Sequence, residues 1–290
     1  APEALVTVHQ VHSARALPEG TATLLIHGLN PYGFAWVRRV NEDNIDINRN
    51  YLDFSRSTPT NPGYEQVHDW ILLEELTPAA LGQVEQRVGA YVARVGKSAA
   101  ATAITGGQYT HPDGIFYGGQ GLCWSSRQLA EIAGRYLQRA RIVCVLDHHT
   151  GLGPTGHTEL ICRHPTGSME LALARAWLGA DVSSPAQGES ASAVIDGNVR
   201  MAFGALCPQA QVVSVCPEVG TVPETQVLAA LLADNWLHRR GVPLSALGDG
   251  VRRQLMEAFC PADAAWRVQA YERAMTIHRS ALLGLSSVSM

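Results

Sequence analysis

Two apolar, β-branched runs each end directly in a polar motif, and this arrangement constrains the fold more than any other feature. Residues 141–146 read RIVCVL and continue into DHHTG, while residues 211–215 read QVVSV and continue into CPEVGT. Helical patterns lie between and around them. Short buried strands alternating with helices are typical of a sheet covered on both faces, with the ligand site beyond the strand ends. The sequence therefore predicts an α/β fold with a site where these two runs end.

The rest of the pattern predicts one large domain. A chain of 290 residues with 46% hydrophobic residues can bury a sizeable core, so we expect a single domain over residues 1–290. Its expected class is α/β, with a mixed sheet and helices on both faces. Periodicity places a further strand at residues 23–27, helices at residues 3–17, 77–95, 126–140, 169–178, 192–206, 225–240 and 261–283, and an ordered loop at residues 41–61.

Composition excludes two classes of partner. The formal net charge is −4, which lacks the basic footprint of a nucleic-acid-binding domain. No apolar run approaches the roughly 20 residues needed to cross a bilayer, and the first ten residues lack the order of a signal peptide. The six cysteines are scattered without a CxxC pair, which favours reduced thiols and a cytoplasmic location. Composition says nothing about the oligomeric state.

The first strand-end motif combines a carboxylate with two histidines. If the strand continues past residue 146, Asp147 and His149 share one face, because side chains alternate along a strand. His148 then points to the other face. A metal-bound imidazole needs its second ring nitrogen oriented, which a nearby carboxylate can do. A pair of hydrogen-bonded histidines at a sheet edge is the alternative.

The second strand-end motif carries one carboxylate, Glu218. A carboxylate that follows a buried strand and faces a cleft can act as a general base. A glutamate that caps a turn or pairs with an arginine is the structural alternative, and the motif alone does not separate the two.

A dense polar loop, RRVNEDNIDINRNY at residues 38–51, supplies groups that recognise anions. It places Arg38, Arg39 and Arg49 among several asparagines. Guanidinium groups bind carboxylates through paired hydrogen bonds, and asparagine adds a neutral donor. The loop therefore predicts an anion-recognition site, with a solvated, self-capped loop as the alternative.

Four motifs in order, HGLNPYGFAWVRRVNEDNIDINRNYLDF, GQYTHPDGIFYGG, LDHHTGLGPTGH and PEVGT, carry a family resemblance. Together they resemble the zinc carboxypeptidase superfamily, most closely its bacterial branch described as a domain of unknown function, DUF2817. The resemblance runs from about residue 24 to the C-terminal helix. The first motif is long enough to be specific, and the other three are weak alone.

The resemblance implies a role for each motif. Asn48 and Arg49 match the Asn-Arg pair that binds the terminal carboxylate of the substrate, and Arg39, favoured over Arg38 by its spacing, matches the arginine that stabilises the oxyanion. His149 matches a zinc ligand. Glu218 matches the base that deprotonates the zinc-bound water.

The chain also departs from the family pattern. The superfamily begins its zinc site with a His-x-x-Glu pair, in a sequence similar to HGVEG, before the strand that leads to NPYG. Residues 1–22 contain no such pair; His9 and His12 are spaced as HxxH but fall on the predicted helix. Zinc bound by a single protein ligand would be lost easily, since catalytic sites usually supply three. We therefore expect an N-terminally incomplete site and poor zinc retention.

The expected function is that of a zinc-dependent hydrolase of the metallocarboxypeptidase type. Zn²⁺ is the expected cofactor, and the expected substrate is a small peptide with a free carboxylate. One alternative is an amidohydrolase acting on an N-acyl amino acid, by the same metal chemistry. A second alternative is a metal-free protein that binds carboxylates without catalysis.

Overall fold

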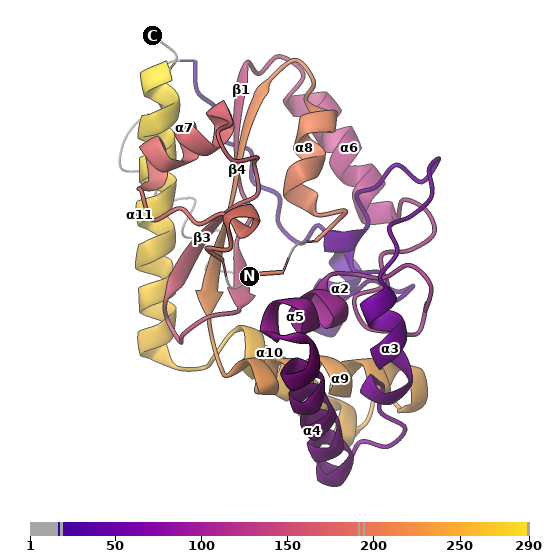
Figure 1. Ribbon diagram of the computed structural model, residues 1–290. Helices are drawn as coiled ribbons and strands as arrows, with labels where there is room; N and C mark the ends of the chain where they lie inside the picture. The colour runs from indigo at the N-terminus through magenta and orange to yellow at the C-terminus, as the bar shows by residue number, and fades with distance from the viewer. Residues whose placement is uncertain (1–16, 18–19, 191, 194, 289–290) are drawn as a thin grey trace.

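The computed structural model describes residues 17, 20–190, 192–193 and 195–288 (Figure 1). Its strands are β1 (Ile142–Leu146), β2 (His149–Gly151), β3 (Thr158–Cys162) and β4 (Gln211–Gly220). Its helices are α2 (Pro31–Trp36), α3 (Pro62–Ile71), α4 (Pro78–Val95), α5 (Lys97–Thr105), α6 (Trp124–Tyr136), α7 (Met169–Leu178), α8 (Val199–Leu206), α9 (Glu224–Arg240), α10 (Ala246–Phe259) and α11 (Ala264–Val288), with 3-10 turns at Ile47–Arg49 and Pro185–Gln187.

Strand β4 is the centre of the sheet, because it pairs with all three other strands. β1 and β2 run parallel to successive stretches of β4, with Ile142 opposite Gln211 and His149 opposite Glu218. The register is unchanged between the two stretches, so β1 and β2 act as one interrupted strand. β3 pairs antiparallel with the second half of β4. The sheet is therefore mixed, as predicted.

Helices cover both faces of this sheet (Figure 1). On one face, Val213 and Val215 pack in a buried cluster with Leu171 of α7 and Ile277 of α11. On the other, Val212 packs with residues of α6 and α8 in a second cluster. Side chains two apart on β4 share a face, so the buried run at residues 212–215 supplies both clusters. The predicted α/β class with helices on both faces is confirmed.

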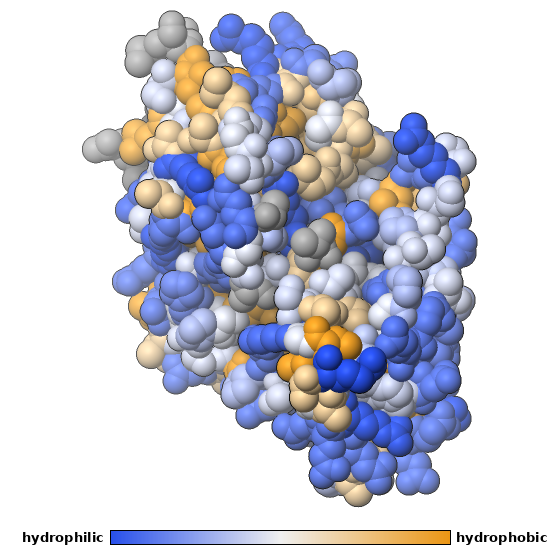
Figure 2. Space-filling view, in the orientation of Figure 1, coloured by the Kyte–Doolittle hydropathy of each residue, from blue (hydrophilic) through white to orange (hydrophobic). Residues whose placement is uncertain are grey.

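A separate helical region lies beyond the strand ends. Helices α3, α4, α5, α9 and α10 share a buried cluster that includes Tyr64, Ile71 and Leu232. Figure 2 shows mainly hydrophilic residues over α3 and the lower end of α4. These helices therefore bury their apolar faces against one another and turn polar faces to water.

Several predicted elements agree closely with the structure. The helix predicted at residues 77–95 is α4, whose first turn is capped by the Thr77 side chain and begins with Pro78. The helix predicted at 169–178 is α7, with its bounds as predicted. The loop predicted at 41–61 contains only the 3-10 turn. The six cysteines are unpaired, and no helix among the described residues is long and apolar enough to cross a membrane.

Two predicted elements are wrong. Residues 23–27 form no strand, and their apolar side chains are open to solvent, with Leu25 47% exposed. An apolar run becomes a strand only when another segment offers its backbone groups, and none of the described residues does so here. The helix predicted at 192–206 begins only at Val199. Gly197 interrupts it with a φ of +66°, and a Cβ there would lie 2.3 Å from the carbonyl oxygen of Arg49.

Other elements escaped prediction or fall outside the description. The structure adds β2, β3, α3, α5 and α10, and extends β4 to Gly220. The helix predicted at 3–17 carries His9 and His12, and both histidines lie outside the described residues.

Candidate active site

Two adjacent strands bring His149 and Glu218 side by side. His149 is the first residue of β2 and stands directly opposite Glu218 in the parallel ladder. Paired residues on neighbouring strands project to the same face of a sheet. The His149 Nδ1 and Glu218 Oε2 atoms are 4.0 Å apart. Two strand-end motifs that are far apart in the sequence thus form one constellation.

Asp147 holds the His149 ring from behind. Its Oδ2 atom lies 2.8 Å from His149 Nε2. Burial alone would raise the pKa of Asp147, but His149 and Arg200 together hold it below its ordinary value. A carboxylate hydrogen-bonded to Nε2 leaves Nδ1, on the Glu218 side, as the nitrogen with the free lone pair. The imidazole is therefore oriented as a ligand or base toward Glu218.

Glu218 is a buried carboxyl, with 6% of the residue exposed. The Leu152 backbone N–H donates to its Oε1 at 3.1 Å. Burial raises the pKa of Glu218, against the opposing effects of His149, the Leu152 N–H, Arg39 and Arg200. A carboxyl that keeps its proton to a higher pH than an ordinary glutamate is better matched to proton transfer near neutrality.

The donor set at this face fits a divalent metal ion. One ligand atom each from His149, Cys216 and Glu218 lies within 4.8 Å of the others. Cys216 stands two residues before Glu218 on β4, so both project to the same face. Zinc takes nitrogen, sulfur and oxygen donors at about 2.0–2.3 Å, and donors spaced in this way can close on one ion. Cys216 is therefore a donor beyond the residues predicted from the sequence.

Arg39 belongs to the polar loop, and its charge reaches this constellation. Its Nε donates to Asp46 Oδ2 at 2.9 Å, and its guanidinium lies 5.2 Å from the centre of the Phe116 ring. It is 26% exposed and lowers the pKa of Glu218. Arg39 is thus a partly accessible cation within electrostatic reach of the candidate base.

Asn48 and Arg49, which were predicted to bind the substrate carboxylate, are both buried and already hydrogen-bonded within the protein. Asn48 Oδ1 accepts the Val199 N–H at 3.0 Å at the start of α8. Arg49 is 4% exposed, and it donates through Nη1 to the Asn48 carbonyl at 2.8 Å and through Nη2 to the Thr105 carbonyl. Its Nε atom is buried without a partner. Burial lowers the pKa of Arg49 to about 10, although Asp46 opposes the shift.

Arg200 of α8 was not predicted from the sequence. It is 3% exposed, and its Nη1 atom lies 3.9 Å from Asp147 Oδ2. Both Nε and Nη1 are buried without hydrogen-bond partners. Nothing in the sequence near residue 200 marks it, because the contact depends on how α8 packs on β4. The period-two pattern of β4, by contrast, could have indicated Cys216.

The other histidines of the sequence motifs lie elsewhere. His148 projects to the opposite face, as its position predicts, and its Nε2 atom lies 2.9 Å from Nε2 of His278 on α11. The two rings are stacked with centroids 5.0 Å apart. His157 is exposed in the loop before β3. Of the histidines described near the strand ends, His149 alone belongs to the donor group with Glu218.

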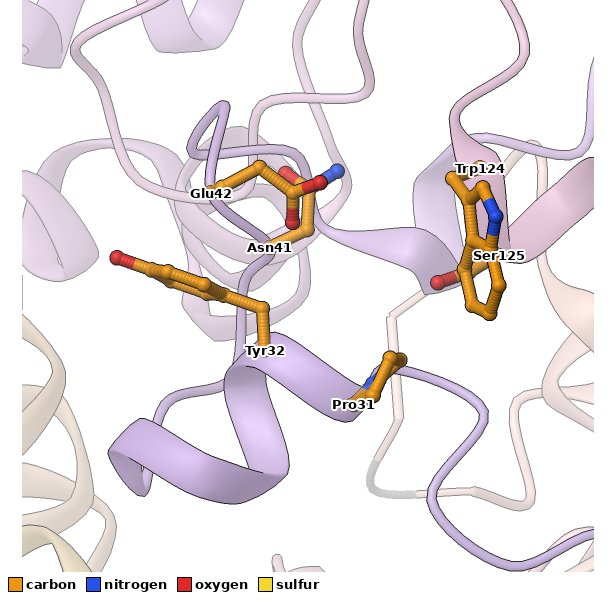
Figure 3. A pocket seen from close by; sticks show the side chains of 6 residues that line it. All are labelled: Pro31, Tyr32, Asn41, Glu42, Trp124 and Ser125. Carbon is orange, nitrogen blue, oxygen red and sulfur yellow. The ribbon is translucent and has the colours of Figure 1, made fainter.

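A cavity of about 360 Å³ lies apart from this constellation. Figure 3 shows Tyr32, Asn41 and Glu42 on one side and Trp124 and Ser125 on the other. Neither His149 nor Glu218 lines it. We locate the candidate site by its converging side chains, because a metal-assisted reaction requires those donors and the cavity lining holds no nitrogen or sulfur ligand.

Comparison with known proteins gives one match. A family model described as "Protein of unknown function (DUF2817)" matches residues 4–273. No curated protein and no solved structure matches the chain.

Proposed function

We propose that this chain, which belongs to the DUF2817 family, is a zinc-dependent hydrolase that cleaves an amide bond beside a residue with a free carboxylate. One observation carries the proposal: Asp147, His149 and Glu218 converge on one sheet face, where a ligand nitrogen faces a buried carboxyl at 4.0 Å. That pairing combines a metal ligand with a general base. The likeness of its motifs to zinc carboxypeptidases adds support.

His149 and Cys216 are the residues that would hold the ion, while Glu218 remains the base. Asp147 fixes the His149 tautomer and the orientation of its ring. Two protein ligands are fewer than catalytic zinc sites usually have. We therefore expect weak zinc binding that a chelator reverses. A bound ion would supply a water of lowered pKa and polarise the substrate carbonyl.

Glu218 accepts the proton of the attacking water in this proposal. The Leu152 N–H holds its Oε1 atom in place. Its Oε2 atom, on the His149 side, contacts the Cys216 thiol at 4.0 Å and is the oxygen that takes the proton. The same carboxyl can then return that proton to the leaving amine. No other described group needs to change its protonation state.

Arg39 would stabilise the oxyanion that develops at the scissile carbonyl, because its charge already reaches Glu218. Asn48 and Arg49 would hold the terminal carboxylate of the substrate. The buried, unpartnered Nε of Arg49 supports this role. Because Asn48 Oδ1 accepts the Val199 N–H, the segment around Val199 would have to shift if Asn48 turns to the substrate.

The discriminating experiment supplies zinc to the full chain and measures three substrates: a dipeptide with a free C-terminal carboxylate, its amide, and an N-acyl amino acid. The proposal expects hydrolysis of the free dipeptide and little of the amide. Faster turnover of the N-acyl amino acid would instead assign an amidohydrolase. If the chain binds carboxylates but turns over none of the three substrates, the enzyme proposal is wrong and the chain is a carboxylate-binding protein.

A further inference from the structure

A second cluster of metal-ligand side chains lies outside the candidate active site. His68 on α3 and His111 and Asp113 on the following glycine-rich loop place ligand atoms within 4.8 Å of one another. Glu65, one helical turn before His68, contacts His111 of this pair. None of these residues belongs to the donor group at His149, so the cluster is a separate feature.

Glu65 orients the His111 ring. Its Oε2 atom lies 2.8 Å from His111 Nε2, while its Oε1 accepts the Thr110 hydroxyl at 2.6 Å. The hydrogen bonds from Thr110 and then from His111 lower the pKa of Glu65, so it is an anion. An anionic acceptor places the ring proton on Nε2 and leaves a lone pair on Nδ1. A histidine held by a carboxylate in this way is typical of metal sites.

The two imidazole rings are packed face to face. Their centroids are 3.5 Å apart, with 20° between the planes. Two protonated rings at this separation would repel each other strongly. Burial, and then the neighbouring His111, lowers the pKa of His68, which favours the neutral imidazole that a metal ligand requires at that residue.

Two side chains of the cluster, His68 and Asp113, could each bind a further partner. His68 Nδ1 is buried and has no hydrogen-bond partner, an arrangement that costs stability unless something binds there. The Asp113 carboxylate is about half exposed and pairs with Arg239, whose Nη2 lies 3.5 Å from Oδ2. A ligand with positive charge and an affinity for imidazole would satisfy both groups.

We propose that His68, His111 and Asp113 form a second site for a divalent transition-metal ion of the zinc type. Two imidazoles and a carboxylate are a donor set that such ions take, unlike Mg²⁺ or Ca²⁺, which prefer oxygen. Glu65 would orient His111 without being a ligand itself. Three protein ligands exceed the two expected at His149, so this site should bind zinc more tightly.

The position of the site assigns it a structural role. The ion would join α3 to the loop that carries Phe116. The Arg39 and Arg49 guanidiniums lie 5.2 Å and 5.4 Å from the centre of that ring. Asn44 also donates to the carbonyls of Pro112 and Gly114, which tightens the link. Metal at this site would therefore fix the loop against which the candidate substrate-binding arginines pack.

The test titrates Zn²⁺ into the metal-free full chain by calorimetry and compares two variants. H149N removes the ligand of the candidate active site, whereas the double variant H68N/H111N removes the second site. We expect H149N to keep a tight site and the double variant to lose it. In H149N zinc should raise the Tm, and in H68N/H111N that shift should vanish. H27N, at an exposed histidine outside both donor groups, is the matched control and should bind like the parent.

A milder variant covers the case in which the double variant fails to fold. E65Q removes the orienting charge but no ligand, so zinc affinity should fall by about 10- to 100-fold. The proposal is wrong if H149N binds no zinc, or if both E65Q and H68N/H111N bind it as the parent does. These outcomes do not depend on hydrolysis, so they separate this site from the proposed activity.

Discussion

The two faces of β4 and its parallel neighbour differ sharply in what they carry. On one face, Val213 and Val215 are fully buried against α7 and α11. The polar contacts near the strand end on this face include the stacked pair of His148 and His278 and the Thr150 hydroxyl, which donates to the Phe259 carbonyl. The other face carries Cys216 and Glu218 opposite His149. Alternate residues of the same strands therefore serve packing and chemistry.

The comparison shows how a buried strand can present reactive groups. Each face extends across both strands because the parallel register stays unchanged through the break at Asp147 and His148. The packed face fixes the strands relative to each other, and the polar face takes its geometry from that register. Changes on the polar face should therefore alter chemistry with little loss of stability, and changes on the apolar face should do the reverse.

The largest effect should come from E218Q. Glutamine keeps the shape of the side chain and the Leu152 contact but accepts no proton at neutral pH. The rate of zinc-dependent hydrolysis should fall by a factor of about 10²–10⁴, while the unfolding midpoint changes little. E224Q, at an exposed glutamate on α9 paired with Lys97, is the matched control. Equal rates in E218Q and E224Q would remove Glu218 from the mechanism.

The apolar face should give the largest change in stability. Leu160 of β3 is 1% exposed and packs in the cluster with Val213 and Val215. L160A should lower the free energy of unfolding by about 2–5 kcal/mol, measured by denaturant titration. Activity per folded molecule should stay near that of the parent. A loss of activity at full folding would show that the two faces are not separable.

A smaller effect is expected for the residue that supports the ligand. D147N keeps the volume of the side chain but removes the charge that orients His149. Zinc affinity at the active site should fall by about 10- to 100-fold, measured in the H68N/H111N background so that only one site titrates. Unchanged affinity would mean that the Asp147–His149 contact is structural.

The smallest expected effect is on the stability of the fold at acid pH, and it comes from His238 on α9, which lies on neither face of the sheet. Burial lowers the pKa of His238 on α9 to about 4, with Arg38 and Arg252 adding to the shift. The unfolded chain binds this proton near its ordinary pKa of about 6.5. Stability from His238 is therefore complete above that value and is lost as the pH falls toward 4. The Tm should drop over this range, and less so in H238Q; an identical drop would assign the acid sensitivity to other groups.

Much of the fold follows from local patterns in the sequence. The opposite directions of His148 and His149 follow from the period of a strand, and Thr77 with Pro78 marks the start of α4. The strand β2 escaped prediction because a three-residue strand has no periodicity of its own. Its conformation is set by pairing with β4.

The missed parts of the candidate site depend on tertiary packing. Arg200 reaches Asp147 from α8, which starts at Val199, two residues after the left-handed Gly197. The burial of Arg49 depends on Thr105 and Val199, which are distant in sequence. No local pattern encodes these contacts, so the sequence placed the motifs but could not show how enclosed the arginine would be.

The most direct test compares two adjacent histidines on opposite faces. H148N and H149N make the same substitution one residue apart, at positions that face α11 and Glu218 respectively. The rate of hydrolysis of a dipeptide with a free carboxylate, at fixed free zinc, is the measurement. We expect H149N to abolish hydrolysis and H148N to retain it. Equal rates in the two variants, or greater loss in H148N, would contradict the assignment of the chemistry to the His149 face.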